Sequence, residues 1–239
     1  MNFAYNEEPV LHDINIHIPA GSTLAIVGRV GSGKTTLARL LPRLIQADEG
    51  QILIDGKSLD QIPHRSIRNA IGYVPQDTFL FSDTIRENII LGFKPATDAD
   101  VAQAAEVSQL TPDLAVLPDG LETVVGERGV TLSGGQKQRT ALARAVIRRP
   151  RILILDDAMA SVDTRTEEEI LKRLRNVMAE RTTILIAHRI STVKDADHIV
   201  VLDEGRITEQ GTHEKLITLN GIYADMYQRQ HLADELEEL

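Results

Sequence analysis

The stretch GRVGSGKT at residues 28–35 constrains the fold more than any other feature of the sequence. It follows Leu24–Val27, a short run that is apolar on both faces, as in a buried parallel strand, and it opens a predicted helix over Lys34–Leu41. Glycines at this spacing let consecutive backbone N–H groups turn inward around phosphate groups, at the positive end of the helix. A glycine-rich turn that only caps a helix would not require Lys-Thr in this register. We therefore predict a phosphate-binding loop in which Lys34 contacts the β- and γ-phosphates and Thr35 ligates Mg²⁺. Further nucleotide contacts are expected from Gly28, Gly31, Ser32, Gly33 and Thr36.

A second apolar run, Ile152–Leu155, ends in two aspartates, Asp156 and Asp157. Four apolar residues indicate a buried strand, and Asp156 emerges where a magnesium-bound water would sit. Any buried strand can end in aspartate, so this motif is weak alone. Together with the phosphate-binding loop it predicts a site for ATP and Mg²⁺, with Asp156 on the metal side.

The remaining pattern alternates between strands and helices. Predicted strands lie at 14–18, 51–54, 71–74, 183–187 and 199–202, and predicted helices at 84–91, 98–108 and 135–147. Apolar side chains of a further helix fall on one face, at Ile170, Leu171, Leu174, Val177 and Met178. The sequence therefore predicts an α/β protein whose core is interrupted, from about residue 77 to 150, by a mostly helical insert. We assign residues 1–239 to one nucleotide-binding domain.

Composition excludes several classes of function. The chain of 239 residues carries 35 acidic and 26 basic residues, a formal charge of -9, which argues against nucleic acid as the main partner. It has no cysteine, so a disulfide, a thiolate metal site and a cysteine nucleophile are impossible. We see neither a signal-peptide pattern nor an apolar run near the ~20 residues of a membrane helix. The acidic run at 234–238 is interpreted as a solvated tail.

The sequence LSGGQ at residues 132–136 narrows the family. Two glycines after a serine, at a helix start, expose backbone donors to an anion. Because the chain already has one phosphate loop, this second one implies an anion supplied by another molecule. Here the chain resembles, over essentially its whole length, the ATPase domains of ABC transporters. The resemblance implies a P-loop NTPase core with an antiparallel β-subdomain and an inserted α-helical signature subdomain. It also implies nucleotide contacts from Ser133, Gly134, Gly135 and Gln136.

The same resemblance gives roles to isolated residues. Tyr5 is similar to the aromatic residue that stacks on adenine, although a core tyrosine is the alternative. Gln76 resembles the glutamine that joins magnesium to the membrane-domain contact, and His188 resembles the switch histidine that reaches the γ-phosphate. Asp163 resembles the loop residue that crosses the dimer, where Ala160 replaces the family's usual serine.

Two segments are similar to the exporter branch of the family. GERG at residues 126–129 precedes the signature as in exporters, where it senses the partner's membrane helices. PQDTFLF at 75–81 matches the exporter loop that receives a coupling helix, although its apolar residues would also suit a local core. The resemblance implies a domain cut from a longer transporter, working at the cytoplasmic face of the cell membrane with transmembrane domains and a second nucleotide-binding domain.

One residue departs from the family pattern at the centre of the chemistry. The family's general base, a glutamate, is Asp157 here, whose carboxylate is set back by on the order of 1 Å, and such a misplacement can cost about 10²-fold in rate. We expect a site that holds ATP well and hydrolyses it slowly. Exporters with this substitution are often heterodimers of one weak and one competent site, and the residues Ala158 and Met159 favour that group. A homodimer with a slow base is the alternative.

Other classes of function remain open at this point. A soluble ABC ATPase acting on DNA or ribosomes would lack membrane domains, but it usually has tandem ATPase units or a long coiled coil, and neither is visible. A mainly structural ATP-binding regulator gains support from Asp157. The segment at 126–129 favours the exporter ATPase.

Overall fold

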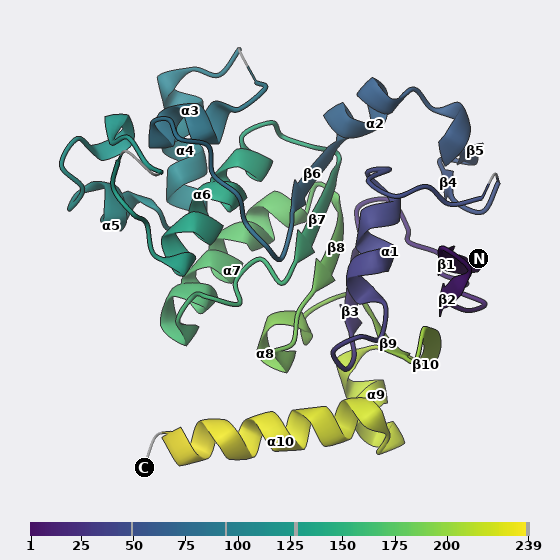
Figure 1. Ribbon diagram of the computed structural model, residues 1–239. Coiled ribbons are helices and arrows are strands. Elements are labelled where there is room, and N and C mark those ends of the chain that lie inside the picture. Colours follow the sequence, from purple (N-terminus) through teal and green to yellow (C-terminus); the bar gives the residue numbers. More distant parts are fainter. Residues whose placement is uncertain (49, 94, 127–128, 238–239) are drawn as a thin grey trace. The chain divides into compact units, whose positions relative to one another are not determined.

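The computed structural model describes residues 1–48, 50–93, 95–126 and 129–237, and it divides into two compact units (Figure 1). The first unit comprises Met1–Arg68 and Thr182–Leu239, and the second comprises Asn69–Arg181. In sequence, the second unit is thus inserted into the first. The predicted α/β class is confirmed. The predicted helical stretch of about 77–150 lies within the second unit, and its boundaries as a subdomain stay a prediction.

The first unit is built on four neighbouring strands in the order β10-β9-β3-β8. Their bounds are β3 Thr23–Val27, β8 Thr182–Ile186, β9 His198–Asp203 and β10 Arg206–Gly211. The strands β3, β8 and β9 are parallel, and Ala25 of β3 is paired to Leu185 of β8 on one side and to Ile199 of β9 on the other. All three residues are buried, as expected for parallel strands covered on both faces.

The remaining elements of the first unit are β1 Phe3–Tyr5, β2 Glu8–Leu11, α1 Lys34–Leu40, β4 Leu53–Ile54, β5 Lys57–Ser58, the 3₁₀ turn η1 Leu59–Gln61, α8 Ile190–Val193, α9 His213–Leu219 and α10 Ile222–Glu237. The helix α2 His64–Ala70 begins in the first unit and ends in the second. The β4–β5 hairpin turns at Asp55 and Gly56, which both have positive φ, as the predicted Asp-Gly turn requires. The helix α10, yellow in Figure 1, follows α9 closely in the chain.

The second unit contains two parallel strands and a group of helices. The strands are β6 Ile71–Val74 and β7 Ile152–Asp156, with Tyr73 paired to Ile154. The helices are α3 Ile85–Ile90, α4 Asp98–Val107, α5 Thr111–Leu114, the 3₁₀ turn η2 Gly120–Glu122, α6 Gly134–Val146 and α7 Thr164–Met178. In α7 the predicted apolar face is observed: Ile170 and Leu174 are fully buried. The three long predicted helices each agree with α3, α4 and α6 to within one residue per end.

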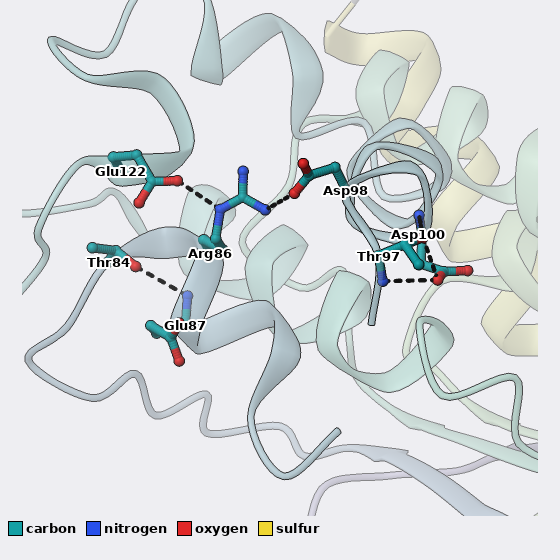
Figure 2. A network of polar contacts seen from close by, with 7 residues as sticks. All are labelled: Thr84, Arg86, Glu87, Thr97, Asp98, Asp100 and Glu122. Atoms are coloured by element: carbon teal, nitrogen blue, oxygen red, sulfur yellow. Dashed lines mark hydrogen bonds and ion pairs between the residues drawn. The ribbon is translucent and has the colours of Figure 1, made fainter. Parts of the chain in front are cut away.

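Polar contacts tie the helices of the second unit together (Figure 2). Arg86, on α3, forms ion pairs with Asp98 at the start of α4 (2.7 Å) and with Glu122 of η2 (2.6 Å). The hydrogen bond to Glu122 is the main reason why the pKa of Arg86 rises above its usual value. Thr97 and Asp100 form a capping box at the start of α4, in which each residue accepts a hydrogen bond from the other's backbone N–H.

Two predictions of local structure need correction. Residues 14–18 do not form a strand: the backbone pairs with Met1 only at Ile14, although burial still alternates. The strand predicted at 51–54 is limited to Leu53–Ile54, because only a two-residue partner is paired with it. The helix α10 extends through Glu237 into the acidic run, whose Glu235 is exposed, as the prediction of a solvated tail expects.

Candidate functional site

The phosphate-binding loop lies in the first unit, between the end of β3 and the start of α1. Gly28 has φ 150, and a Cβ there would lie 2.0 Å from the Leu202 carbonyl oxygen. Gly33, at the N-cap of α1, has φ 101, and a Cβ there would lie 2.7 Å from the Leu11 side chain. Any larger residue would collide with β9 or β2. The two glycines are therefore required by both conformation and packing.

Side chains of the loop provide a cation and an unsatisfied hydroxyl. Lys34 is only 6% exposed, and its Nζ donates hydrogen bonds of 2.8 Å to the carbonyl oxygens of Gly28 and Arg29. The Ser32 hydroxyl is buried and finds no partner within the part of the chain that the structure describes. A buried ammonium group and an orphaned hydroxyl beside an uncapped helix start suit an anion with several oxygens. The loop thus fits the phosphates predicted from its sequence.

The other predicted nucleotide residues of this unit have distinct environments. Thr36 is buried and Thr35 is half-buried, both in the first turn of α1. Tyr5 ends β1 and is partly exposed, and its ring packs edge-to-face on Phe3 with centroids 4.9 Å apart. His188 follows β8 and is half-buried. The core position considered for Tyr5 is therefore not observed, whereas stacking on adenine stays a prediction.

The acidic strand end lies in the second unit. Asp156 is the last residue of β7, fully buried, and accepts a 3.2 Å hydrogen bond from the Tyr73 hydroxyl of β6. Asp157 follows with φ 48 and is 5% exposed. Its carbonyl oxygen accepts from the Ala160 N–H at 3.1 Å and from Gln138 Nε2 at 3.4 Å. The left-handed backbone suits aspartate better than most residues.

The LSGGQ segment starts α6 with a complete capping box. The Ser133 hydroxyl accepts from the Gln136 N–H at 3.2 Å, and Gln136 Oε1 accepts from the Ser133 N–H at 2.9 Å. Gln136 Nε2 also donates to Asp113 at 3.1 Å, and that carboxylate pairs with Arg139 at 2.7 Å. The sequence indicated the exposed donors of this segment but not Asp113 or Arg139, which lie outside the motif.

The glycine pair of the signature packs against the loop that precedes α7. A Cβ on Gly134 would lie 3.1 Å from the Cβ of Ser161, and one on Gly135 would lie 3.0 Å from the Ser161 carbonyl oxygen. Asp163 caps α7 by accepting from the Thr166 N–H at 3.0 Å. Hydrogen bonds from Thr166 lower the pKa of this carboxyl. Asp163 thus has a structural role within the chain in addition to the predicted one.

The segment at 75–81 presents its apolar residues to the outside. Gln76 is exposed, and the rings of Phe79 and Phe81, 66% and 48% exposed, pack edge-to-face 5.0 Å apart. The alternative that these rings form a local core is therefore wrong.

The backbone of this segment is held by residues that the sequence did not reveal. Arg144 donates to the carbonyl oxygens of Phe79 at 3.0 Å and Asn88 at 2.7 Å, and the amide of the buried Asn88 exchanges hydrogen bonds with the backbone of Phe81. Burial lowers the pKa of Arg144. Asn88 lies on α3, seven residues after Phe81, and Arg144 lies on α6, 65 residues after Phe79. Neither residue belongs to a motif that the sequence reveals. Of the predicted segment at 126–129, Glu127 and Arg128 lie outside the described residues.

The predicted site residues therefore fall into two groups, each assembled within its own unit. The first unit holds Tyr5, the loop at 28–36 and His188; the second holds Gln76, Asp156, Asp157 and the signature at 132–136. Within the described residues, no helix combines the length and apolarity that a membrane span needs.

Comparison with known proteins identifies this arrangement. Residues 11–160 match the family model described as ABC transporter. An ATM1-type heavy metal exporter of Novosphingobium aromaticivorans is 48% identical over 229 residues, 95% of this chain and 38% of that protein. An ATP-dependent lipid A-core flippase of Desulfotalea psychrophila is 46% identical over 230 residues, 96% of this chain and 40% of that protein.

The solved structures agree. The structure titled as a bacterial Atm1-family ABC exporter with ATP bound superposes with a TM-score of 0.91 at 48% identity, over 96% of this chain and 41% of the other. The chain belongs to the ABC transporter family, as predicted, and the relatives named above include Atm1-type exporters. It spans about two fifths of the length of these curated relatives.

Proposed function

We infer that this chain is the ATP-hydrolysing part of an ABC exporter, working at the cytoplasmic face of the cell membrane and coupled to transmembrane domains. The observation that carries this function is the phosphate loop, where a buried Lys34 and a Ser32 hydroxyl that has no partner among the described residues lie at a helix start without a capping side chain. The similarity to exporters over 95% of the chain supports the coupling to membrane domains. A soluble ABC ATPase lacking such domains is the less favoured candidate.

In the proposed site, the loop at 28–36 binds the phosphates of ATP. Lys34 turns from the two carbonyl oxygens that it now contacts toward the β- and γ-phosphates, and Tyr5 stacks on adenine. Thr35, Asp156 and Gln76 all offer oxygen atoms, the ligand type that Mg²⁺ prefers, so this donor set fits the metal. When bound, Mg²⁺ supplies charge neutralisation on the β- and γ-phosphate oxygens.

Hydrolysis in this proposal depends on Asp157 and His188. Asp157 accepts the proton of the attacking water, and His188 donates a hydrogen bond to the γ-phosphate. Asp157 is held by a buried backbone whose carbonyl oxygen is bonded twice, so the main chain does not advance to compensate for the missing methylene. The expected result is a site that retains ATP and hydrolyses it slowly.

Two nucleotide-binding domains pair face to face in this proposal, each covering the other's nucleotide with its signature. An intact LSGGQ beside a weakened base favours a heterodimer, in which this chain completes the competent site of a different subunit. The homodimer remains the second candidate. The membrane domains and the transported substrate belong to parts of the transporter beyond this chain.

The experiment combines calorimetry with light scattering on the purified chain. We expect MgATP to bind at one site per chain, and we expect a mainly monomeric chain without nucleotide to self-associate when ATP is added. Lys137→Ala, an exposed lysine on α6, serves as the control for Lys34→Ala. Failure of the chain to bind MgATP would overturn the proposed function. A stable nucleotide-free dimer would contradict ATP-driven pairing.

A further inference from the structure

The C-terminal helix α10 reaches the segment that carries His188. Gln230, in the middle of α10, donates from Nε2 to the carbonyl oxygen of His188, while its Oε1 accepts from the Ile190 N–H at 2.6 Å. Both partners are backbone groups and lie within the first unit. Because a carbonyl only accepts and an N–H only donates, the orientation of the Gln230 amide is determined by its partners. One side chain thus holds the main chain on both sides of Arg189.

The local sequence supplies no substitute for this contact. Ile190 is the first residue of the short helix α8, and its N-cap residue, Arg189, forms no side-chain cap. An uncapped first turn leaves backbone N–H groups to be satisfied by other parts of the protein. Gln230 therefore performs for α8, from 40 residues away, the task that a serine or aspartate would perform locally.

The helix that carries Gln230 is itself anchored at its first turn. The carboxylate of Glu209, on β10, accepts from the N–H of Ile222 at 2.5 Å and from that of Tyr223 at 3.1 Å. The Tyr223 hydroxyl lies 2.8 Å from Nδ1 of His213 on α9. The start of α10 is therefore bonded to the sheet and to α9, which gives Gln230 a defined origin rather than a free helix end.

We propose that Gln230 is a positioning residue for ATP hydrolysis: by binding the His188 carbonyl and the Ile190 N–H, it couples α10 to the placement of the His188 imidazole. This inference rests on the proposed function, in which His188 reaches the γ-phosphate. The hydrogen bonds of Gln230 described above go to backbone groups and not to a nucleotide-binding side chain, so its loss should affect the rate and leave the affinity for ATP nearly unchanged. A displacement of the imidazole by 1 Å can cost up to about 10²-fold in rate.

The test compares Gln230→Ala and Gln230→Glu with Gln228→Ala, an exposed glutamine two residues earlier on the same helix. The first measurement is amide hydrogen exchange at Ile190, followed by NMR without nucleotide. We expect about tenfold faster exchange in Gln230→Ala and no change in Gln228→Ala. Gln230→Glu retains the acceptor for Ile190 but brings a carboxylate against the His188 carbonyl, so exchange should change less. Unchanged exchange in Gln230→Ala would refute the contact whatever the enzymology shows.

The second measurement is single-turnover hydrolysis at saturating MgATP, with the dissociation constant of ATP measured in parallel. We expect the rate to fall about five- to tenfold in both Gln230 variants, with affinity within twofold of wild type. In a His188→Ala background, Gln230→Ala should cause no further loss. An additive loss there, or an unchanged rate in Gln230→Ala, would overturn the positioning role. If His188→Ala itself hydrolyses normally, the proposed role of His188 fails, while exchange at Ile190 still decides whether Gln230 fixes this segment.

Discussion

Two helix starts in this chain face the same chemical task in the proposed function, and they are built in opposite ways. The α1 start has a left-handed glycine, Gly33, at its N-cap, and within the described part of the chain it has no capping side chain and the adjacent Ser32 hydroxyl has no partner. The α6 start has Ser133 at its N-cap, bonded reciprocally to Gln136. Among the described residues the first therefore offers a buried hydroxyl that an anion can satisfy, whereas the second is capped by its own residues.

This difference teaches how one chain can carry two phosphate-facing loops without binding two nucleotides. An unsatisfied helix start gains hydrogen bonds when it binds an anion, so it can bind alone. A capped start gains only what its remaining N–H groups and helix dipole provide. We expect the α6 loop to contribute only to a nucleotide that is already held by a second chain. Four predictions test this contrast, in order of decreasing effect.

The largest effect is expected from Lys34→Ala. Removing the buried ammonium should weaken MgATP binding by about 100-fold or more, roughly 3 kcal/mol, because no other cation of the loop is buried in the described structure. Lys137→Ala, next to the capped loop, should leave affinity within twofold. Calorimetric titration measures both, and circular dichroism checks that Lys34→Ala remains folded. An affinity for MgATP in Lys34→Ala equal to that of wild type would contradict the proposed difference between the α1 and α6 starts.

Asp157→Glu should raise the single-turnover hydrolysis rate about tenfold, which is about 1.4 kcal/mol of barrier. The change restores one methylene without altering the acid chemistry, so position alone differs. The left-handed φ of Asp157 tolerates glutamate less well, and we expect a loss of stability below about 1 kcal/mol.

Asp157→Asn keeps the shape of the side chain but removes the carboxylate that acts as base. It should therefore lower the single-turnover hydrolysis rate. ATP affinity should stay constant in both variants, because Asp157 is not expected to bind the ground-state phosphates. Measurement at high concentration in the self-paired chain ensures an intact signature opposite the site. A rate that glutamate leaves unchanged would show that side-chain length is not the limitation.

Ser133→Ala separates the two helix starts more finely. Loss of the cap should lower the free energy of unfolding by about 1 kcal/mol. The affinity of the single chain for ATP should not change, whereas ATP-dependent self-association should weaken. Thr84→Ala is the control, since Thr84 caps α3 with a 3.0 Å bond from the Glu87 N–H and has no predicted role in nucleotide binding. Thermal unfolding and light scattering with ATP distinguish them: equal losses of self-association would reduce Ser133 to a stabilising cap.

Much of this architecture was predictable because it is encoded locally. The loop at 28–35, the strands β6 and β7, and the helices α3, α4 and α6 each have a continuous signal of apolar spacing, glycine or capping residues. Elements determined by distant partners were missed. The C-terminal helix α10 has its apolar and polar residues mixed around the helix, and its start depends on Glu209 of β10.

The site shows the same division between local and distant signals. The motifs predicted the phosphate loop and the acidic strand end. The structure adds the conformations of the loop glycines and the burial of the carboxylate. Residues that contact only backbone groups of the site are not part of any sequence motif. Arg144 donates to the carbonyl oxygen of Phe79, and Gln230 donates to that of His188. Every residue has a backbone carbonyl oxygen, so the sequence does not indicate which of them a distant side chain will contact. Such contacts therefore cannot be predicted from one sequence alone.

The smallest effect concerns a second capping box, at the start of α4, which unlike that of α6 closes through a charged side chain. At α4 the box closes through a carboxylate: Asp100 accepts from the Thr97 N–H at 3.0 Å and from the Thr97 hydroxyl at 2.7 Å, and it pairs with Arg149 at 2.9 Å. The hydrogen bonds from Thr97 are the main cause that lowers the pKa of Asp100 below its ordinary value of about 3.9. At α6 the corresponding residue, Gln136, does not titrate.

A lowered pKa means that the folded chain favours the ionised form, so the stabilisation is present above the unfolded value and is lost as the pH falls through the folded one. Acidification below about pH 4 should therefore weaken the α4 box and spare the α6 box. Asp100→Asn should lower the melting temperature at pH 7. The decrease should be smaller than that of Ser133→Ala, because Asp100 is partly solvated. The difference in melting temperature between Asp100→Asn and wild type should narrow as the pH falls below about 4. Ser133→Ala should show a gap that is independent of pH over the same range. Thermal unfolding from pH 7 to pH 3 measures both, and parallel pH curves for Asp100→Asn and wild type would mean that the carboxylate charge does not stabilise the start of α4.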